Sequence, residues 1–276
     1  MRDNGDMLSP SVPLAGLLAD RAAWKPVAEG EADAIVLRHE SGERYAKIIS
    51  HAGVGVGALE AERDRVEWLS GTGVPGPSVL GWRATEHGAC LITSAVVGVP
   101  ADQLTAAQLA QAWPAICSTL NQLHSIPVDS CQYGRTLEEM MALARATVAE
   151  DRVHPEFLPR SLADTPPTAI LASLERDLPL RREQEAADAV VCHGDFCLPN
   201  IVIDTDTWLV AGLIDLGRLG RADPYADIAL LLANARETWP DEEIASHADR
   251  DFSSRYGITL APDRMDFYLG LDPLTW

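Results

Sequence analysis

The residue types best suited to chemistry stand together between Val190 and Asp215. His193, Asp195 and Asn200 lie in a polar stretch between two short apolar runs, and a third apolar run leads to Asp215. Strands present the loops at their ends, so this order could gather two carboxylates and an amide around one point. Phosphoryl transfer needs such groups: a carboxylate that takes the proton of the acceptor hydroxyl, and oxygen ligands that hold Mg²⁺ on the phosphates. The stretch therefore favours phosphoryl transfer as its chemistry.

The spacing of these residues is more specific than their types. Asp195 and Asn200 lie five positions apart, as do the Asp and Asn of the protein-kinase catalytic loop H-R-D-L-x-x-x-N. Asp215-Leu216-Gly217 follows where a kinase has D-F-G, and His193-Gly194-Asp195 takes the place of H-R-D. The Asp195/Asn200 pair or the Asp215-Leu216-Gly217 segment alone could be a solvated turn after a buried strand. A single motif match is therefore only a hypothesis. The combined pattern favours a kinase-like site.

The composition describes an ordinary globular protein with an unusual charge. The 276 residues are 47% hydrophobic with a mean hydropathy of -0.03, which is enough for one large or two modest domains with a real core. The formal net charge of -19 makes nucleic acid and anionic membrane surfaces poor partners. The same charge would attract a cationic ligand, or it could serve solubility alone.

The sequence predicts neither a membrane span nor a disulfide framework. No run of about 18 apolar residues is present, and Leu8–Leu18 is interrupted by two prolines and preceded by acidic residues, unlike a signal peptide. The five cysteines are an odd number and lack the spacing of a zinc site, which favours reduced thiols and a cytoplasmic location. Residues 1–23 are expected to form a loosely held leader.

Residues 24–96 have the pattern of a small β-rich lobe with one helix. Lys47 lies among apolar residues of a predicted strand, where a buried ammonium needs an anionic partner, although its stem could also reach solvent from an edge strand. In a kinase-like interpretation residues 29–33 form the loop over the nucleotide phosphates, and residues 94–98 form a hinge. The expected strands are Ala34–Arg38, Arg44–Ile49, Ser78–Arg83 and Ala89–Thr93, and the expected helix is Ala58–Ser70.

Residues 97–276 show mainly helical periodicity. A long helix is expected from about Thr105 to His124, with one broad apolar stripe that faces a core. Asp223 and Pro224 suit the N-cap and the first position of a later helix, and Asp227 lies beside the apolar face of that helix. We expect Asp227 to brace the catalytic loop and His124 to pack structurally. Other helical segments are expected at 137–149, 170–177 and 265–269.

Together these motifs resemble the aminoglycoside phosphotransferase family, from about Trp24 to the C-terminus. The segments Ala112–Pro114, Val191–Asp195 and Leu271–Trp276 are most similar to its streptomycin 3''-phosphotransferase branch. The resemblance implies an α+β, two-lobed protein-kinase-like fold, with a nucleotide-binding lobe at 24–96 and a larger, mainly helical lobe at 97–276. It also implies ATP and Mg²⁺ as cofactors. The implied acceptor is an aminoglycoside hydroxyl, most closely the 3'' hydroxyl of streptomycin.

The resemblance carries roles for individual residues. Those of the reacting centre would be a catalytic base, two metal ligands, a phosphate-binding lysine with its glutamate partner, and two hinge residues whose backbone meets adenine. Asp195 would be the base, and Asn200 and Asp215 would be the metal ligands. Lys47 would contact the phosphates with Glu62 as its partner, and Ser94 and Val96 would be the hinge residues.

The residues that would bind the acceptor are Glu237, Asp272 and the terminal Trp276. Acidic groups would meet the guanidinium groups of streptomycin with charge-assisted hydrogen bonds. Relatives that act on other aminoglycosides carry a second acid after the equivalent of Asp272, and Pro273 stands there in this chain. Trp276 could instead do no more than cover core.

Two other function classes remain open. A kinase of choline, homoserine or an amino sugar would share the fold, and a substrate panel with labelled ATP would distinguish it. A catalytically silent nucleotide-binding module would be expected to lack one of Lys47, Asp195, Asn200 or Asp215, and all four are present. A monomer without nucleic-acid or membrane partners is expected.

Overall fold

The computed structural model describes residue 18 and the ranges 20–27, 34–50 and 54–276. The chain forms two compact units, one of Met1–Trp68 with Pro77–Ala95 and one of Leu69–Gly76 with Val96–Trp276. Most of the expected leader and the whole expected phosphate loop at 29–33 lie outside the described residues. The expected lobe boundaries stay predictions, and each unit is considered by itself below.

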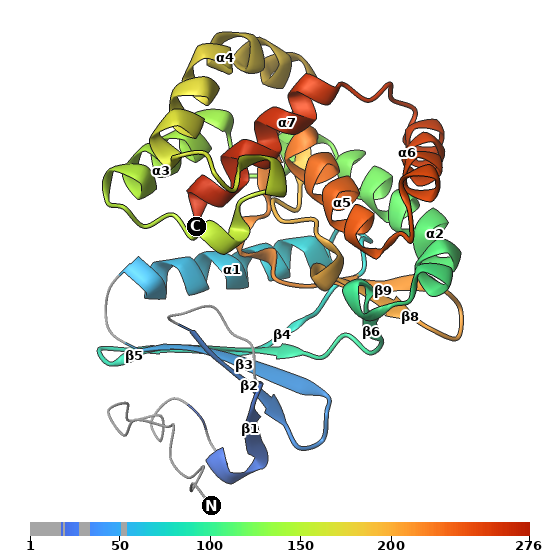
Figure 1. Ribbon diagram of the computed structural model, residues 1–276. Coiled ribbons are helices and arrows are strands. Elements are labelled where there is room, and N and C mark those ends of the chain that lie inside the picture. Colours follow the sequence, from blue (N-terminus) through green and yellow to red (C-terminus); the bar gives the residue numbers. More distant parts are fainter. Residues whose placement is uncertain (1–17, 19, 28–33, 51–53) are drawn as a thin grey trace, which may run out of the picture. The chain divides into compact units, whose positions relative to one another are not determined.

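The first unit is built on a five-stranded antiparallel sheet with the order β1-β2-β3-β5-β4. All four expected strands are present, together with the short β1, which the sequence did not predict. The helix α1 (Val54–Ser70) packs on one face of this sheet (Figure 1). The strands are β1 Trp24–Pro26, β2 Ala34–His39, β3 Arg44–Ser50, β4 Val79–Thr85 and β5 Gly88–Ser94.

Both faces of this sheet are covered by apolar side chains, which fixes the direction of Lys47. Ala46 and Ile48 of β3 belong to the cluster on the face away from α1, with Trp24 and Leu37. Ile49 packs against the opposite cluster, which contains Leu59 and Leu91. Alternate side chains of a strand point to opposite faces, so Lys47 shares the face of Ile49 and α1.

Helix α1 begins four residues earlier than the expected Ala58. Gly55 and Gly57 lie in its first turn, and glycine lowers helix propensity, so the sequence pattern placed the start after them. A side chain at Gly55 would overlap Ile49 of β3. The close approach of the helix to the sheet therefore requires glycine there, and tertiary packing outweighs the weak local propensity.

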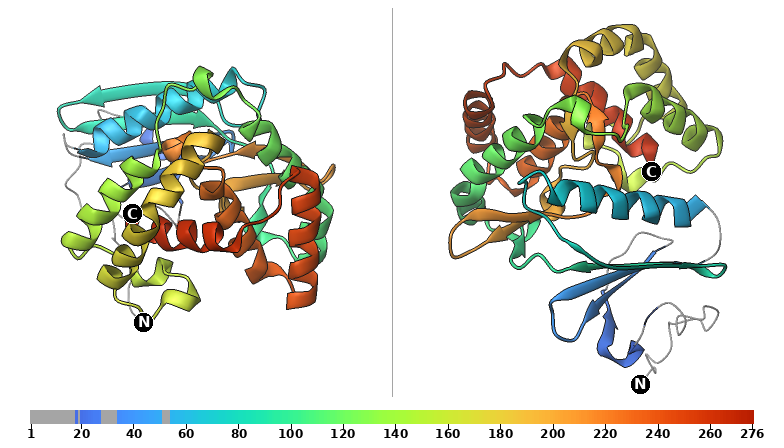
Figure 2. Two further views of the ribbon diagram at one scale, coloured as in Figure 1. Left: turned by 90° about the horizontal axis from the view of Figure 1, so that it is seen from above. Right: turned by 180° about the vertical axis from the view of Figure 1, so that it is seen from behind.

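The second unit is mainly helical. The predicted helices at 105–124 and 137–149 are confirmed, and both begin with a capping box, Thr105 with Gln108 and Thr136 with Glu139. Helices α3, α4 and α7 lie side by side (Figure 2) and share one core cluster with the first turns of α5. The helices are α2 Ala106–His124, α3 Leu137–Ala149, α4 Pro167–Asp188, α5 Tyr225–Thr238, α6 Glu242–Tyr256 and α7 Pro262–Leu271.

Helix α4 is longer at both ends than the expected segment 170–177. It continues through Pro179, which removes one backbone hydrogen bond and would normally end a helix. Leu174 and Leu178 are buried in the core cluster beside α7, and the guanidinium of Arg181 lies over the ring of Phe267. These contacts offset the cost of the proline.

Helix α5 begins at Tyr225, one residue later than predicted. Pro224 is the cap residue, and the Asp223 carboxylate accepts a hydrogen bond from the Tyr225 N–H at 2.9 Å. Asp223 also pairs with the guanidinium of Arg264, so it ties α5 to α7. The predicted apolar face of α5 is buried at all five positions, which are Tyr225, Ile228, Ala229, Leu232 and Ala235.

Two small antiparallel sheets in the second unit position the polar stretch. One has the order β6-β8-β9, and the other pairs β7 with β10. The loop 193–200 connects β7 to β8, and Asp215 follows β9. The strands are β6 Val99–Pro100, β7 Val190–Cys192, β8 Ile201–Asp204, β9 Leu209–Leu213 and β10 Gly220–Ala222.

Short 3-10 helices complete the chain. They include η7 in the catalytic loop, η8 after Asp215 and η9 at the C-terminus. Their bounds are η2 Arg21–Ala23, η3 Ala101–Gln103, η4 Val128–Ser130, η5 Pro155–Phe157, η6 Arg160–Leu162, η7 Leu198–Asn200, η8 Leu216–Arg218 and η9 Asp272–Thr275.

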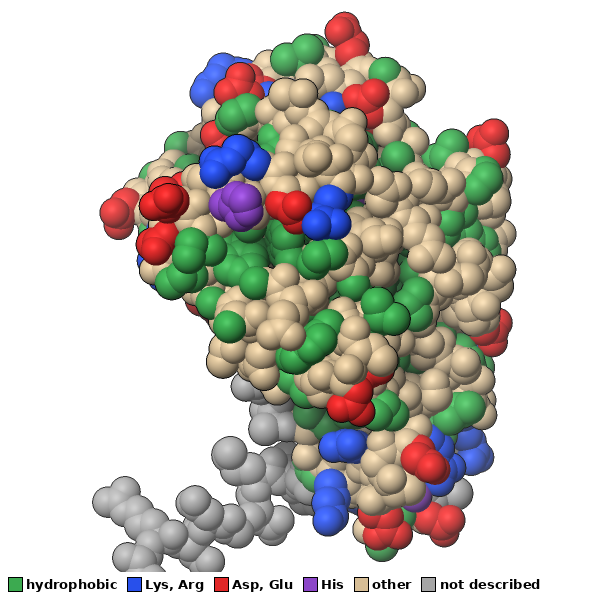
Figure 3. Space-filling view, turned by 90° about the vertical axis from the view of Figure 1, so that its right-hand side faces the viewer, with side chains coloured by type: hydrophobic (Ala, Val, Ile, Leu, Met, Phe, Trp, Pro, Cys, Tyr) green, Lys and Arg blue, Asp and Glu red, His purple; other side chains and the backbone are tan. Residues whose placement is uncertain are grey.

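The surface and the cysteines agree with the composition. On the face drawn in Figure 3, acidic side chains lie among basic and hydrophobic ones, and several gather at its left edge. Within the described ranges, no helix is long and apolar enough to cross a membrane. None of the five cysteines, all of which the structure describes, is in a disulfide; four are buried and Cys197 is half-buried.

Candidate active site

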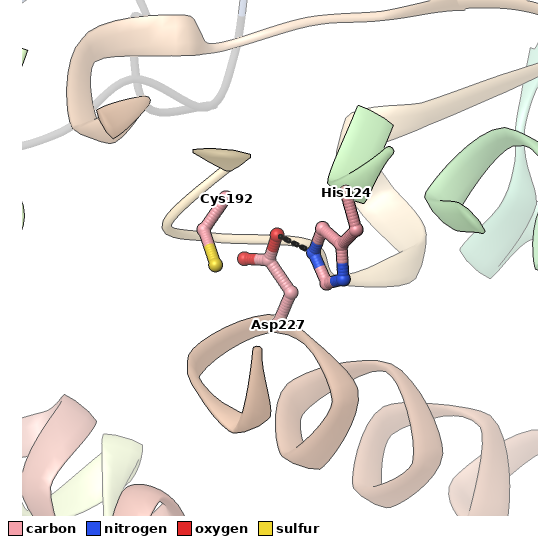
Figure 4. A group of neighbouring side chains, drawn as sticks. All are labelled: His124, Cys192 and Asp227. Carbon is pink, nitrogen blue, oxygen red and sulfur yellow. Dashed lines mark hydrogen bonds and ion pairs between the residues drawn. The ribbon is translucent and has the colours of Figure 1, made fainter. Parts of the chain in front are cut away.

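Hydrogen bonds to Asp227 of α5 hold the loop that carries Asp195. The Asp227 carboxylate accepts hydrogen bonds from the backbone N–H groups of His193 and Gly194, at 2.6 and 2.8 Å. His124 at the end of α2 approaches the same carboxylate with Nε2 at 3.1 Å (Figure 4) and Tyr256 with Nδ1 at 2.6 Å. The predicted bracing role of Asp227 and the structural role of His124 are therefore what the geometry shows.

His124, Cys192 and Asp227 lie close enough to suggest a metal site. Their potential ligand atoms are all within 4.8 Å of one another, and all three side chains are buried. Both oxygens of Asp227 already accept hydrogen bonds from the loop, and the Cys192 thiol donates to the carbonyl of Asp223 at 3.3 Å. The group in Figure 4 is thus a hydrogen-bonded brace.

Replacing Asp227 by asparagine is expected to lower the free energy of unfolding at neutral pH by about 1.5–3 kcal/mol, the range for losing a hydrogen bond to a charged group. Burial alone would raise the pKa of Asp227, but the hydrogen bonds from His124 and the His193 backbone outweigh it and hold the pKa below its usual range. Because the pKa of Asp227 is lower in the folded state, the charged carboxylate stabilises the fold at pH values above the ordinary pKa of about 4. This stabilisation is lost as the pH falls through the folded-state pKa.

Urea unfolding of wild type and Asp227→Asn across pH checks this prediction. The difference in unfolding free energy should be constant near neutral pH and shrink in the acid range, where the wild-type carboxylate becomes protonated. A difference that persists unchanged into strong acid would show that the carboxylate charge is not what stabilises the loop.

Asp195 and Asn200 are joined by their side chains. Asn200 Nδ2 donates to the Asp195 carboxylate at 2.9 Å and to the Asp195 carbonyl at 3.0 Å. Both residues are buried, with 8% and 9% of their surface exposed. The Cys197 thiol lies beside them, 3.3 Å from Asn200 Nδ2, and burial together with the charge of Asp195 raises the pKa of this thiol. Among the described residues, the hydrogen bonds of the Asn200 amide all use Nδ2, so Oδ1 is the atom left for a cation.

Asp215 is brought to this group by its neighbour Ile214. The Ile214 N–H donates to the Asn200 carbonyl at 3.0 Å, and the Ile214 carbonyl accepts from His193 Nε2 at 3.0 Å. Asp215 itself adopts the left-handed conformation, with φ 58 and ψ 62, which aspartate tolerates better than most residues. The structure thus places Asp195, Asn200 and Asp215 on two loops joined by backbone hydrogen bonds.

The donor set of these loops fits a hard divalent cation. A carboxylate on Asp215 and an amide oxygen on Asn200 are ligands of the kind that Mg²⁺ accepts, with water and phosphate oxygens completing the shell. The half-buried Cys197 keeps its thiol protonated, because its pKa is raised, and so offers no competing soft ligand.

In the first unit, Lys47 and Glu62 form an ion pair. Lys47 Nζ donates to Glu62 Oε2 at 2.9 Å, and the two side chains are 21% and 13% exposed. The strand position of Lys47 aims its ammonium at α1, where Glu62 is found. Lys47 therefore does not escape to solvent from an edge strand, because β3 lies between β2 and β5.

The two expected hinge residues differ in their backbone bonding. Ser94 ends β5; its N–H donates to the Ser78 carbonyl and its hydroxyl accepts from the Ser78 N–H, both at 2.9 Å. Val96 contacts Gly212 through its methyl groups. Among the described residues none hydrogen-bonds the Val96 backbone, so this backbone is the better suited of the two to meet a nucleotide base.

The C-terminal residues Asp272 and Trp276 are paired with Arg218 in the second unit, and Asp272 lies within electrostatic reach of Asp195. Arg218 Nη1 is 3.4 Å from Asp272 Oδ1, the Trp276 indole donates to Asp272 Oδ2 at 3.2 Å, and the Arg218 guanidinium lies 3.2 Å from the centre of the Trp276 ring. Burial and the charge of Asp195 raise the pKa of Asp272, and Arg218 opposes this. Asp272 is thus already paired within the chain.

Glu237 is placed differently from the other candidates. It is exposed near the end of α5, and no described contact joins it to the Asp195 group. The sequence analysis also gave no role to Arg135, a buried cation within electrostatic reach of Asp195. The Gly134-Arg135 pair before α3 carries no motif, and only its long-range contacts reveal it.

Comparisons with known proteins agree with this geometry. A model of the phosphotransferase enzyme family matches residues 23–268. The chain is 55% identical to streptomycin 3''-kinase of Streptomyces griseus over 92% of each chain. It is 37% identical to an aminoglycoside 3'-phosphotransferase of Streptomyces fradiae, over 90% of this chain and 94% of the relative.

A solved structure extends the likeness to three dimensions. The aminoglycoside phosphotransferase APH(3'')-Id of Streptomyces rimosus, in complex with ADP and streptomycin, superposes with a TM-score of 0.90 at 50% identity, covering 96% of this chain and 99% of that one. The predicted α+β, protein-kinase-like fold is confirmed. The chain belongs to the aminoglycoside phosphotransferase family.

Proposed function

We propose that the protein transfers the terminal phosphoryl group of ATP to the 3'' hydroxyl of streptomycin, which inactivates the antibiotic and confers resistance. The observation that carries this proposal is the joined Asp195, Asn200 and Asp215 group in a chain 55% identical to a streptomycin 3''-kinase. The ADP and streptomycin bound to the Streptomyces rimosus relative support the same donor and acceptor classes.

Asp195 is the proposed catalytic base. Its carboxylate is buried and held by Asn200, so it is positioned to accept the proton of the acceptor hydroxyl as that oxygen attacks phosphorus. The brace of Asp227 under Gly194 fixes the loop, so the carboxylate needs little reorganisation before reaction.

Nucleotide-binding roles are proposed residue by residue. Asn200 and Asp215 would hold Mg²⁺, which neutralises charge on the phosphates when it is bound. Lys47, oriented by Glu62, would contact the phosphates. The backbone of Val96, and of Ser94 through its carbonyl, would meet the adenine. These roles are proposals supported by the ion pair, the donor set and the family.

Acceptor binding is proposed for Glu237, Asp272 and Trp276. Asp272 lies within electrostatic reach of Asp195, which supports its place in an acceptor site. Asp272 and Trp276 are both engaged with Arg218. A guanidinium of the acceptor would therefore share Asp272 with Arg218 or displace it. A cytoplasmic location, which the use of ATP would require, and a monomeric state are also part of the proposal.

Transfer of labelled phosphate from ATP to a panel of acceptors tests the function. Streptomycin should be phosphorylated with Mg²⁺ present, and kanamycin and choline should be poor acceptors. Mass spectrometry of the product should place one phosphate on the N-methyl-glucosamine ring. If kanamycin or choline is turned over and streptomycin is not, the acceptor is wrong, while the kinase activity remains.

A further inference from the structure

Arg135 is a buried cation within electrostatic reach of Asp195, and the proposed function assigns it no role. Its side chain is 8% exposed and stands two residues before α3. The Arg135 N–H donates to the Arg221 carbonyl at 3.1 Å, and the Arg221 N–H donates to the Tyr133 carbonyl at 2.9 Å. Arg221 lies in β10, which pairs with β7, the strand that leads into the catalytic loop. The backbone thus fixes Arg135 beside that loop.

The stem of Arg135 contacts the residue that precedes Asp195. Gly194 has a φ of +82, and a side chain there would overlap the Cδ of Arg135 and the backbone carbonyl of Arg218. Only glycine combines this conformation with such close neighbours. Arg135 and Arg218 therefore enclose Gly194 and limit the positions that the Asp195 backbone can adopt.

The guanidinium of Arg135 reaches the C-terminal turn η9. Its Nη2 is 3.4 Å from Thr275 Oγ1 and 4.0 Å from Asp272 Oδ1. Arg218 approaches the same Asp272 oxygen at 3.4 Å. Two guanidinium groups thus hold one turn of chain. The same two arginines lie against Gly194 with other atoms, Arg135 with its Cδ and Arg218 with its backbone carbonyl. Arg135 connects the C-terminal turn to the catalytic loop.

The charge of Arg135 suits this position. Asp195, Asp227 and Asp272 all lie within its electrostatic reach, and buried carboxylates need a countercharge. Burial and the nearby Arg218 lower the pKa of Arg135 to about 10, so the side chain is still a cation at neutral pH. Its Nε is buried and has no hydrogen-bond partner among the described residues, so few hydrogen bonds hold the group.

We propose that Arg135 is a positioning residue for phosphoryl transfer, which holds the turn η9 against Gly194 and thereby keeps Asp195 and Arg218 in place. The inference rests on the proposed function. Arg135 would touch neither nucleotide nor acceptor. Its removal should shift the reacting carboxylate, and a misplacement of about 1 Å can cost about 10²-fold in rate.

Two substitutions at Arg135 and one matched control test the role. Arg135→Met keeps an aliphatic side chain and loses the positive charge. Arg135→Lys keeps the positive charge but lacks the planar guanidinium with its several N–H donors. Arg181→Met is the control, because Arg181 is also buried, at 5% exposure, also has an unpartnered Nε, and packs on Phe267 away from the loop. In the folded fraction, kcat should fall by about 10²-fold in Arg135→Met, less in Arg135→Lys, and not in Arg181→Met.

Hydrogen exchange provides a readout that needs no acceptor. Amides of 192–198 and 271–276 should exchange faster in Arg135→Met, at a temperature where the protein is folded, and not in Arg181→Met. If Arg135→Met does not fold, Thr275→Val replaces it in this experiment, because it removes the Oγ1 atom that accepts from Arg135. This variant should also accelerate exchange in the same two segments. Unchanged kcat, or unchanged exchange in these segments, overturns the proposal. If the wild type does not phosphorylate streptomycin, the proposed function fails, and the exchange experiment still decides whether Arg135 holds the turn.

Discussion

Replacing Asp195 by asparagine is expected to lower kcat for streptomycin phosphorylation by about 10²–10⁴-fold, the range for loss of a general base. The substitution preserves the size of the side chain and one of its oxygens. Asn200 Nδ2, which donates to the Asp195 carboxylate at 2.9 Å, can donate to that remaining oxygen. The loop should therefore keep its conformation, and nucleotide affinity should stay near that of the wild type.

Steady-state kinetics and calorimetric titration with nucleotide separate these two effects. Asp206→Asn is the matched control, because Asp206 is an exposed acid in the turn after β8 and should tolerate the same chemical change. The control should match the wild type in kcat. An Asp195→Asn protein that folds and turns over at nearly the wild-type rate would exclude Asp195 as the base.

The core of the site was predictable because its geometry is local. The hydrogen bond between Asn200 and Asp195 spans five positions, so the spacing of the motif contains it. The Lys47–Glu62 pair spans 15 positions and joins a strand to a helix. Strand alternation showed only that Lys47 needs a partner, and the family resemblance was needed to choose Glu62 among several glutamates of that helix.

The bracing role of Asp227 was predicted, but its long-range contacts, and the role of Arg135, could not be. His124 and Asp227 are 103 positions apart, and Arg135 and Thr275 are 140 apart. No periodicity or motif links residues at such separations, because the contact depends on how helices pack. The left-handed backbone of Asp215 is a similar case, since no motif of the sequence specifies that conformation at this position.

Helix ends show the same limit. Gly55 and Pro179 lower local helix propensity; the sequence analysis began one helix after Gly55 and ended the other before Pro179. In the structure both residues are inside helices, because Gly55 lies against Ile49 and α4, which contains Pro179, packs against α7. Local propensity correctly indicates that glycine and proline destabilise a helix. It does not include the tertiary contacts that offset this cost.

Replacing Asp215 by alanine is expected to abolish the gain in nucleotide affinity that Mg²⁺ provides. Losing partners that only orient a metal ligand costs about 10–100-fold in metal affinity, so losing a carboxylate ligand should cost more than about 10²-fold. Asn200→Ala should reduce turnover more than ADP binding, because it also releases the Asp195 side chain. Calorimetric titration of each variant with nucleotide, with and without Mg²⁺, measures both effects.

The backbone of Asp215 requires a second variant as a control. Alanine is strained at a φ of 58, so Asp215→Ala could disturb the loop as well as remove the carboxylate. Asp215→Gly removes the same carboxylate and relieves that strain. If the carboxylate holds the cation, both variants should lose the Mg²⁺ dependence equally, with Asp215→Gly retaining the higher melting temperature. Recovery of the Mg²⁺ dependence in Asp215→Gly would mean that the backbone conformation, and not the carboxylate, determines the affinity.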